Sequence, residues 1–166
     1  MYIYLPVEVS PREMVSRSIL AAKLASKGWN VIVFQSNLFD RVGWPGKGIY
    51  IGKNFFRTES PCDFKYYREM KEAGIEIRFL DEEGAISIGR DKLGWEKRLV
   101  ARFDPKYFSK EDTVYTWGEW QKEIFDAHGC QARVAVSGSP NFTAYKKEYL
   151  DQSKAMNQEI VNNLDG

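Results

Sequence analysis

The chain has 166 residues, which fits one domain that buries about 70 % of the surface of its unfolded chain. Its 24 basic and 23 acidic residues give a net charge of +1, which argues against nucleic acid or an anionic membrane as a partner attracted by bulk charge. No apolar run approaches the roughly 20 residues of a membrane helix, and the N-terminal residues lack the pattern of a signal peptide.

The cysteine and histidine content argues against a zinc site. Cys62 and Cys130 lie far apart and match neither a CxxC motif nor a disulfide framework, so we interpret them as ordinary thiols of a cytosolic protein. One histidine and two distant cysteines do not supply the ligands that zinc needs. The sequence therefore predicts a cytoplasmic protein without a metal site.

The first part of the chain predicts a strand, a helix and a second strand. Residues 2–7 form a short apolar strand, which should end or bulge at Pro6 because proline cannot donate to a sheet. Residues 11–27 carry apolar side chains at spacings of three and four, the pattern of an amphipathic helix. Residues 31–34 are continuously apolar, which is typical of a strand covered on both faces. This βαβ unit predicts parallel strands joined by a right-handed crossover.

Strands and helices alternate through the rest of the chain. Further strands are expected at residues 48–51, 75–80, 113–115 and 133–136, and further helices at residues 60–74, 95–103, 116–128 and from residue 139. Residues 1–150 therefore predict an α/β domain, an open parallel sheet with helices on both faces, in which the strands at 2–7, 31–34 and 75–80 are interior. Residues 151–166 are polar and uncapped, and we expect a helical or mobile tail there.

The predicted helix starts share a capping pattern. Candidate capping residues are Ser10, Ser60, Thr116 and Ser139. Glu13 completes a capping box with Ser10. These helix starts should line the same edge of the sheet as Glu8, with capping as the simpler interpretation of each residue taken singly. The GxGxxG fingerprint and the GKS/T phosphate loop are both absent from the sequence, which argues against NAD-dependent and P-loop chemistry.

Three consecutive carboxylates follow a predicted buried strand. Asp81, Glu82 and Glu83 come directly after residues 75–80 and precede Gly84. Adjacent carboxylates repel one another, so such a turn needs water, a cation or a hydrogen-bond donor opposite it. Ligands of open α/β sheets bind beyond the carboxyl ends of the strands. The three acids are therefore a candidate site, with a solvated acidic loop as the alternative.

Aromatic residues make up 14 % of the chain, and a packed core absorbs such a content only in part. Candidates for stacking on a sugar are Trp44, Phe55, Phe56, Trp117 and Trp120, with packing inside the protein as the alternative for each. We also expect an apolar patch near Trp117, Trp120 and Phe142, which predicts self-association or a partner.

An ordered set of motifs resembles a known protein family. The set comprises residues 4–9 with Arg12 and Glu13, residues 48–50 with Lys53, residues 81–84, residues 117–119 with Gln121, and residues 138–140. In this order the motifs resemble the N-terminal half of the bacterial surface carbohydrate biosynthesis proteins, over residues 2–145. That family is similar to glycosyltransferases of the two-domain GT-B fold.

The resemblance implies the acceptor-side, Rossmann-like domain of a glycosyltransferase that acts in cell-surface polysaccharide biosynthesis. A nucleotide-sugar would be the donor substrate, with no other cofactor, and a glycan or lipid-linked glycan would be the acceptor. Glu82 or Glu83, beside Asp81, would act as general base or would stabilise positive charge at the anomeric carbon. The ligand-binding residues implied are Glu8, Ser10, Arg12, Lys53, Trp117, Glu119 and Ser139. Such a protein is expected in the cytoplasm, at the inner face of the membrane.

Departures from the family pattern leave alternatives open. Asn141 and Thr143 stand where the family has arginine and aspartate, and neither carries the charge of the residue that it replaces. The sequence also ends where the second Rossmann-like domain of such an enzyme is expected to begin, so a second GT-B half or another copy of the chain is an expected partner. The alternatives are a non-catalytic module that binds a sugar phosphate or docks a partner, and a truncated, inactive copy.

Overall fold

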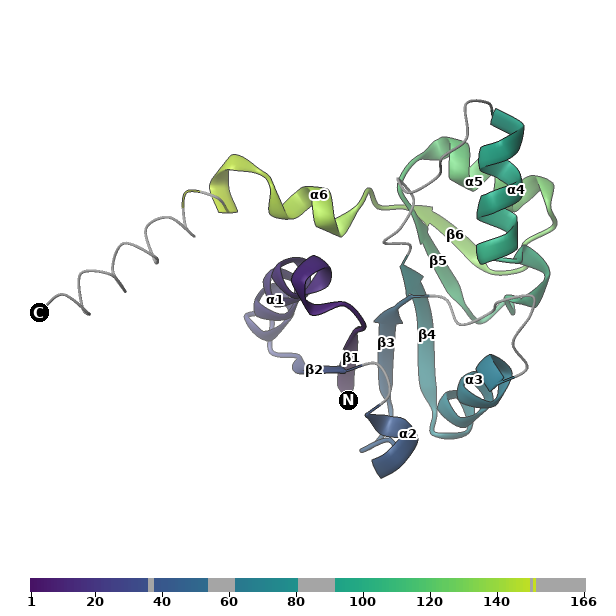
Figure 1. Cartoon of the computed structure of the whole chain (residues 1–166). Helices are drawn as coiled ribbons and strands as arrows, with labels where there is room; N and C mark the ends of the chain where they lie inside the picture. The colour runs from purple at the N-terminus through teal and green to yellow at the C-terminus, as the bar shows by residue number, and fades with distance from the viewer. Residues whose placement is uncertain (36–37, 54–61, 81–91, 150, 152–166) are drawn as a thin grey trace, which may run out of the picture.

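The computed structural model describes residues 1–35, 38–53, 62–80, 92–149 and 151 (Figure 1). Six strands form one sheet in the order β2-β1-β3-β4-β5-β6, and all neighbours pair in parallel. The strands are β1 (Tyr2–Val7), β2 (Asn30–Gln35), β3 (Gly48–Gly52), β4 (Ile75–Leu80), β5 (Thr113–Thr116) and β6 (Arg133–Val136). The helices are α1 (Ser10–Ala25), α2 (Phe39–Val42), α3 (Cys62–Glu72), α4 (Lys92–Arg102), α5 (Glu119–Ala127) and α6 (Pro140–Ala144), with a 3-10 turn η1 (Pro105–Tyr107).

Helices cover both faces of this sheet. Helix α1 packs against β1 and β2, and α6 packs against α1, whereas α3 packs against β4 on the other face (Figure 1). Side chains of β1 alternate between the two faces, so Tyr4 joins the core beside α3 while Ile3 and Leu5 are buried toward α1. The predicted open parallel sheet with helices on both faces is confirmed.

The larger core lies between the sheet and helices α3, α4 and α5, and aromatic rings fill much of it. Phe79 of β4 packs against Phe108 at a centroid distance of 4.8 Å, and Phe103 packs against Phe125 of α5 at 6.0 Å. Fully burying a side chain of this size contributes about 1.5–3 kcal/mol. This core therefore accounts for part of the high aromatic content.

The prediction that residues 31–34 form an interior strand is wrong, because β2 ends the strand order of the described sheet. In β2 only Phe34 is buried, while Val33 is 38 % exposed. An apolar run of β-branched residues indicates a strand, but it does not indicate where in the sheet that strand lies. The position of β2 depends instead on β3, which pairs with β1 on the side away from β2.

Strand β1 has the predicted bounds, whereas the helix caps differ from expectation. Strand β1 continues to Val7, one residue beyond Pro6, and the paired register between β1 and β3 covers only Tyr2 to Tyr4. The N-cap of α1 is Val9 rather than Ser10, which is the first helical residue. The N-cap of α5 is Gly118, and Thr116 is instead the last residue of β5. Short polar residues near a helix start therefore did not identify the cap itself.

Strand β3 lies so close to β1 that glycine is required at both of its ends. A Cβ atom on Gly48 would lie 2.3 Å from the carbonyl oxygen of Tyr2, and one on Gly52 would lie 2.4 Å from Cγ of Pro6. Neither a backbone oxygen nor a proline ring within a sheet moves away readily. This close approach fixes the path of β3 up to its carboxyl end.

We predict that Gly48→Ala lowers the free energy of unfolding by about 1–3 kcal/mol, the usual cost of overpacking a closely packed site. Gly46→Ala is the matched control, since a Cβ there would lie 3.6 Å from the Tyr2 ring, an ordinary contact. The control should change the free energy of unfolding by no more than about 0.5 kcal/mol. Urea unfolding measures both, and equal midpoints for the two variants would contradict the prediction.

Candidate functional site at the β1–β3 edge

The strand order reverses direction at β1. The chain passes from β1 to β2 on one side and then to β3 on the other side of β1. In open α/β sheets the ligand site lies outside the carboxyl ends of the strands at such a switch point. The carboxyl end of β1 leads to Glu8 and the start of α1, and that of β3 leads to Lys53. These segments are therefore the first place to examine for a site.

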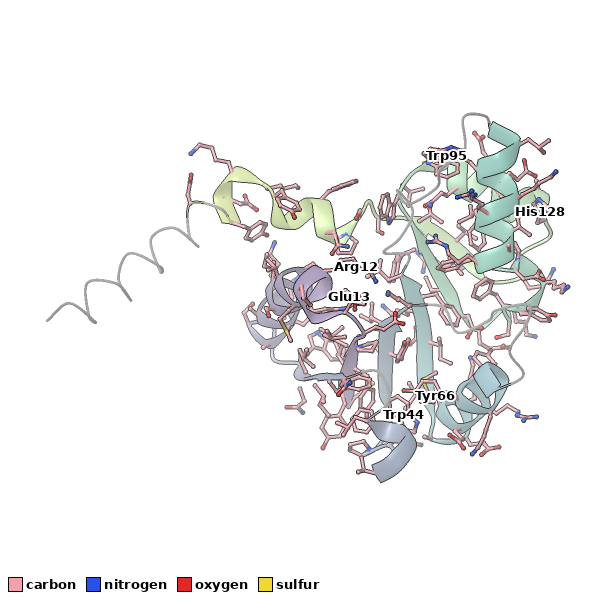
Figure 2. The ribbon with its side chains drawn as sticks, in the orientation of Figure 1. Arg12, Glu13, Trp44, Tyr66, Trp95 and His128 are labelled. Carbon is pink, nitrogen blue, oxygen red and sulfur yellow. The ribbon has the colours of Figure 1, made fainter. Side chains whose placement is uncertain are left out.

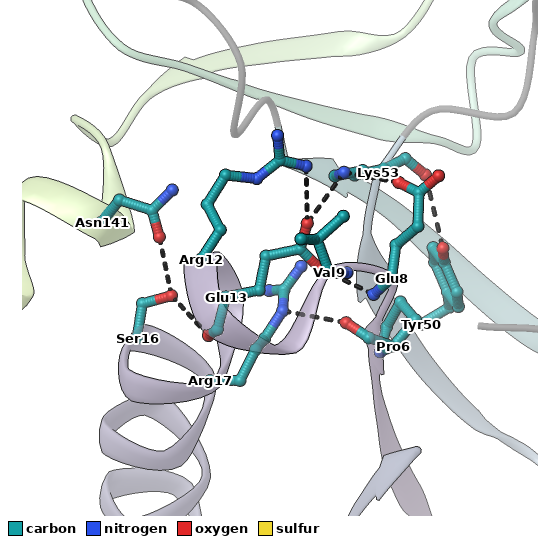
Figure 3. Close-up of polar contacts among 10 residues, drawn as sticks. All are labelled: Pro6, Glu8, Val9, Arg12, Glu13, Ser16, Arg17, Tyr50, Lys53 and Asn141. Carbon is teal, nitrogen blue, oxygen red and sulfur yellow. Dashed lines mark hydrogen bonds and ion pairs between the residues drawn. The ribbon is translucent and has the colours of Figure 1, made fainter. Parts of the chain in front are cut away.

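The centre of this edge is the carboxylate of Glu13, which is only 1 % exposed. Its Oε2 atom accepts hydrogen bonds from the backbone amides of Glu8, at 2.7 Å, and Val9, at 3.3 Å. Its Oε1 atom lies 2.8 Å from Nζ of Lys53 and 3.0 Å from Nη2 of Arg12 (Figure 3). Glu13 therefore joins the end of β1, the first turn of α1 and the end of β3. We call Glu8, Arg12, Glu13 and Lys53 the switch-point cluster.

Glu13 makes the backbone contact that a capping box assigns to its glutamate, with the amide of the N-cap residue Val9. The N-cap residue Val9 has no side-chain oxygen, and Glu13 instead reaches back to the amides of Glu8 and Val9. Pro11, the second helical residue, has no N–H group that needs a partner. The glutamate half of the expected box is therefore present, with Val9 rather than Ser10 as the N-cap, and the side chain of Ser10 lies outside the described part of the chain.

Hydrogen bonding keeps Glu13 charged. Burial opposes its ionisation, but hydrogen bonds from Lys53, from the amide of Glu8 and from Arg12 outweigh burial and lower the pKa of Glu13 to about 2. A carboxylate with this pKa is a poor proton acceptor at neutral pH. Glu13 therefore holds the cations of the cluster and does not act as a general base.

Lys53 has a further carboxylate partner. Its Nζ atom lies 2.5 Å from Oε2 of Glu8, whose side chain is 45 % exposed, whereas the side chain of Lys53 is 20 % exposed. The backbone carbonyl of Lys53 accepts a hydrogen bond from the hydroxyl of Tyr50, at 3.3 Å. Lys53 is thus positioned by its backbone as well as by its charge.

Contacts beneath the cluster tie α1 to the rest of the protein. Arg17, which is buried, donates from Nε to the carbonyl oxygen of Pro6 at 3.1 Å. The hydroxyl of Ser16 lies 2.9 Å from Oδ1 of Asn141, which connects α1 with α6 (Figure 3). Asn141 stands where the resembled family has arginine, and here it has a neutral, structural contact.

The predicted site residues fall into separate groups. Glu8, Arg12 and Lys53 are brought together in the switch-point cluster. Trp117, exposed Glu119 and buried Ser139 lie instead at the carboxyl ends of β5 and β6, which β4 separates from β3. Asp81, Glu82 and Glu83, predicted as catalytic, lie outside the described residues, directly after β4.

Sequence reasoning missed two buried groups of this edge. Glu13 was interpreted as half of a capping box and as part of a family motif but not as a buried partner of Lys53, and Arg17 was not singled out. The spacing of Glu13 and Arg17, four residues apart in a helix, places them on one face, and this is the signal that was available. The burial of this helix face at the end of β1 depends on the sheet.

A second buried carboxylate, Asp112, was also missed, and it lies at the amino end of β5. Its Oδ1 atom lies 2.7 Å from Nζ of Lys71, and its Oδ2 atom accepts from the hydroxyl of Tyr67, at 2.8 Å, and from the amide of Ser109, at 3.0 Å. Burial, reinforced by the charge of Asp112, raises the pKa of the Tyr67 phenol. This group braces α3 and the start of β5 at the edge opposite the switch-point cluster.

Two of the tryptophans proposed as sugar platforms are packed against other rings. Trp44 contacts Tyr4, at a centroid distance of 5.0 Å, and Tyr66 of α3, at 5.5 Å (Figure 2). Trp120 of α5 packs against Trp95 of α4 at 5.6 Å. Both tryptophans are partly buried against the core, which favours the alternative of packing inside the protein. Phe55 and Phe56 lie outside the described residues.

The predicted apolar patch is therefore smaller than expected. Trp117 lies 5.2 Å from Phe142 between ring centroids, and Phe142 is 60 % exposed. Tyr145 is also exposed nearby in sequence, whereas Trp120 belongs to the α4–α5 packing.

We predict that Glu13→Gln lowers the free energy of unfolding at pH 7 by about 1–3 kcal/mol, because charge-assisted hydrogen bonds are lost. The folded-state pKa is depressed, so the stabilisation by Glu13 is complete above its ordinary pKa of 4.5 and is lost as the pH falls toward about 2. The difference from the wild type should therefore shrink below about pH 4.5. Glu123→Gln, at an exposed position of α5, is the control. Urea unfolding from pH 7 to pH 3 tests this, and a difference that grows with acidity would refute it.

We also predict self-association through the patch at Phe142. Phe142→Ser should reduce the average mass measured by light scattering at high concentration, because an exposed ring favours association. Val42→Ser is the matched control, since Val42 is exposed at the end of α2 and belongs to a different element from Phe142. A wild-type protein that stays monomeric at high concentration would remove the prediction.

No helix among the described residues is both long and apolar enough to cross a membrane. In the same residues, histidine, cysteine, aspartate and glutamate side chains do not form a group of three or more that could hold a metal ion. Comparisons with protein-family models, with curated proteins and with solved structures find no match. The function is therefore inferred from the geometry of the site together with the motif resemblance.

Proposed function

We propose that the chain is the acceptor-side domain of a glycosyltransferase of the GT-B type, which acts in the biosynthesis of a cell-surface polysaccharide. The reaction would transfer a sugar from a nucleotide-sugar to a glycan or lipid-linked acceptor. A second Rossmann-like domain, in another chain or another part of the same protein, would hold most of the donor.

The observation that carries this proposal is the ion pair between Glu8 and Lys53. These residues are 45 positions apart and belong to different motifs of the resembled family, yet they meet at the carboxyl edge of the sheet. The meeting point is the strand switch point, where α/β proteins bind their ligands. The pair therefore puts two charged side chains of separate motifs at the edge where a ligand would bind.

In this proposal the residues of the switch-point cluster and the acidic residues after β4 have different chemical roles. Glu13 stays ionised and bonded, so it holds Lys53 and Arg12 in place. The general base would then be Glu82 or Glu83, which follow the carboxyl end of β4. The base would take the proton of the acceptor hydroxyl as that oxygen bonds to the anomeric carbon, while the bond to the nucleoside diphosphate breaks.

A non-catalytic module that binds a sugar phosphate is the second candidate. The observation that favours it is that Glu8 and Glu13 are both held in ion pairs with Lys53. Carboxylates held in this way fix charged groups in space, and the lowered pKa of Glu13 makes that carboxylate a poor proton acceptor. A binding module needs only the first of these properties.

We predict that Glu82→Gln or Glu83→Gln abolishes sugar transfer by the complete two-domain assembly, because a neutral amide cannot act as a general base. The assay follows the transfer of label from a panel of radiolabelled nucleotide-sugars to a bacterial glycolipid extract. Circular dichroism should show an unchanged fold, and the free energy of unfolding should change by no more than about 0.5 kcal/mol.

The matched control is Glu123→Gln, which should leave transfer unchanged. Full transfer activity in both Glu82→Gln and Glu83→Gln would overturn the catalytic assignment. Binding of a sugar phosphate by the wild type, without transfer from any donor of the panel, would favour the binding module instead.

A further inference from the structure

The switch-point cluster contains an anion in a replaceable position. Lys53 bonds to Glu13, which is buried, and to Glu8, which is half exposed. Glu13 cannot turn away, because its second oxygen is held by two backbone amides. Among the contacts of the described residues, the carboxylate of Glu8 has Lys53 as its one partner. An exposed ion pair of this kind contributes little to stability and opens easily.

The charges of the cluster favour an anionic ligand once Glu8 is displaced. Glu13 contributes one negative charge, and Lys53 and Arg12 contribute two positive charges, so these three side chains together carry a charge of +1. Among the described residues, Glu8 adds one negative charge beside Lys53. Lys53 and Arg12 are also held side by side, because both bond to the same oxygen of Glu13, at 2.8 and 3.0 Å (Figure 3).

Side chains rather than backbone amides would bind the anion. At the start of α1 the amides of Glu8 and Val9 already donate to Glu13, and Pro11 has no amide hydrogen. The usual anion site of a helix N-terminus is therefore largely occupied from within. A lysine and an arginine fixed in position bind phosphate at a low cost in conformational entropy.

We propose that Lys53 and Arg12 bind a phosphate group of the ligand, and that the carboxylate of Glu8 occupies the place of this phosphate in the free protein. The inference rests on the proposed function, which supplies two sources of that phosphate. They are the diphosphate of a lipid-linked acceptor and the diphosphate of the nucleotide-sugar. Displacing Glu8 leaves the bond between Lys53 and Glu13 intact. Binding therefore exchanges one anion for another without exposing the buried charge.

The test is calorimetric titration of the purified chain with inorganic pyrophosphate. Glu8→Gln removes the competing carboxylate and should tighten binding by about fivefold, the factor that corresponds to an exposed ion pair. Lys53→Met should weaken binding at least tenfold, and Lys53→Arg should retain it. Asp126→Asn is the matched control, because it breaks the exposed ion pair with Lys122 on α5 and should leave the affinity unchanged.

The test remains decisive even if the Lys53→Met variant does not fold. The other two variants are expected to fold, since Glu8→Gln leaves Glu13 fully bonded and Lys53→Arg keeps the positive charge. Equal affinity of Glu8→Gln and the wild type, or a change of affinity in Asp126→Asn as large as that in Glu8→Gln, would overturn the proposal. Titration with uridine diphosphate and with farnesyl diphosphate distinguishes the two sources of the phosphate. Tighter binding of uridine diphosphate indicates the nucleotide-sugar, and tighter binding of farnesyl diphosphate indicates the lipid-linked acceptor.

Failure of this site and failure of the proposed function give different results. If the affinity for pyrophosphate does not depend on Glu8 and Lys53 but the complete assembly still transfers sugar, the phosphate site alone is refuted. Specific pyrophosphate binding by a complete assembly that transfers no sugar refutes the transferase and leaves the phosphate site standing.

Discussion

The arrangement of the functional edge depends on one buried negative charge, that of Glu13. A carboxylate away from water is tolerated only when donors surround it, and here the donors come from the end of β1, the first turn of α1 and the end of β3. Each of these elements must hold its place for the charge to stay satisfied. The electrostatic requirement of one side chain therefore fixes the relative positions of all three segments.

Asp112 applies the same constraint at the opposite edge of the sheet. It gathers Lys71 and Tyr67 of α3 and the amide of Ser109 at the start of β5. Glu13 lies beyond the carboxyl ends of β1 and β3, and Asp112 lies before the amino end of β5. The sheet between them is held by apolar packing, and its two edges are held by buried ions. At the carboxyl edge the buried ion lies beside the partly exposed Glu8 and Arg12, and at the amino edge it lies beside Lys71, whose side chain is 30 % exposed.

The sequence was sufficient to predict most strands and helices, because the periodicity of apolar residues and the positions of glycines are local signals. Strand β4 and strand β6 have the bounds that were predicted from the sequence. Strand order is not local, so the edge position of β2 could not be derived from an apolar run that fits an interior strand equally well.

The candidate site was predictable only in part, for the same reason. Glu8, Arg12 and Lys53 were proposed because they belong to motifs, but the residue that binds them together, Glu13, was hidden by its resemblance to a cap. Its role depends on the distance between β1 and β3, which is set by the glycines of β3. No spacing within a single segment carries that information.

The position of β2 has a consequence for solubility. A terminal strand presents backbone donors and acceptors that are not used by a neighbour, and another strand can add there. Strand β2 offers a Val-Ile-Val-Phe run of this kind, with Val33 partly open to solvent. Asn30 and Gln35 flank the run with polar but uncharged side chains. Edge strands are ordinarily protected by charge, proline or a covering element, and within β2 itself there is neither a charged residue nor a proline, so strand addition between molecules would be favoured at this end of the described sheet.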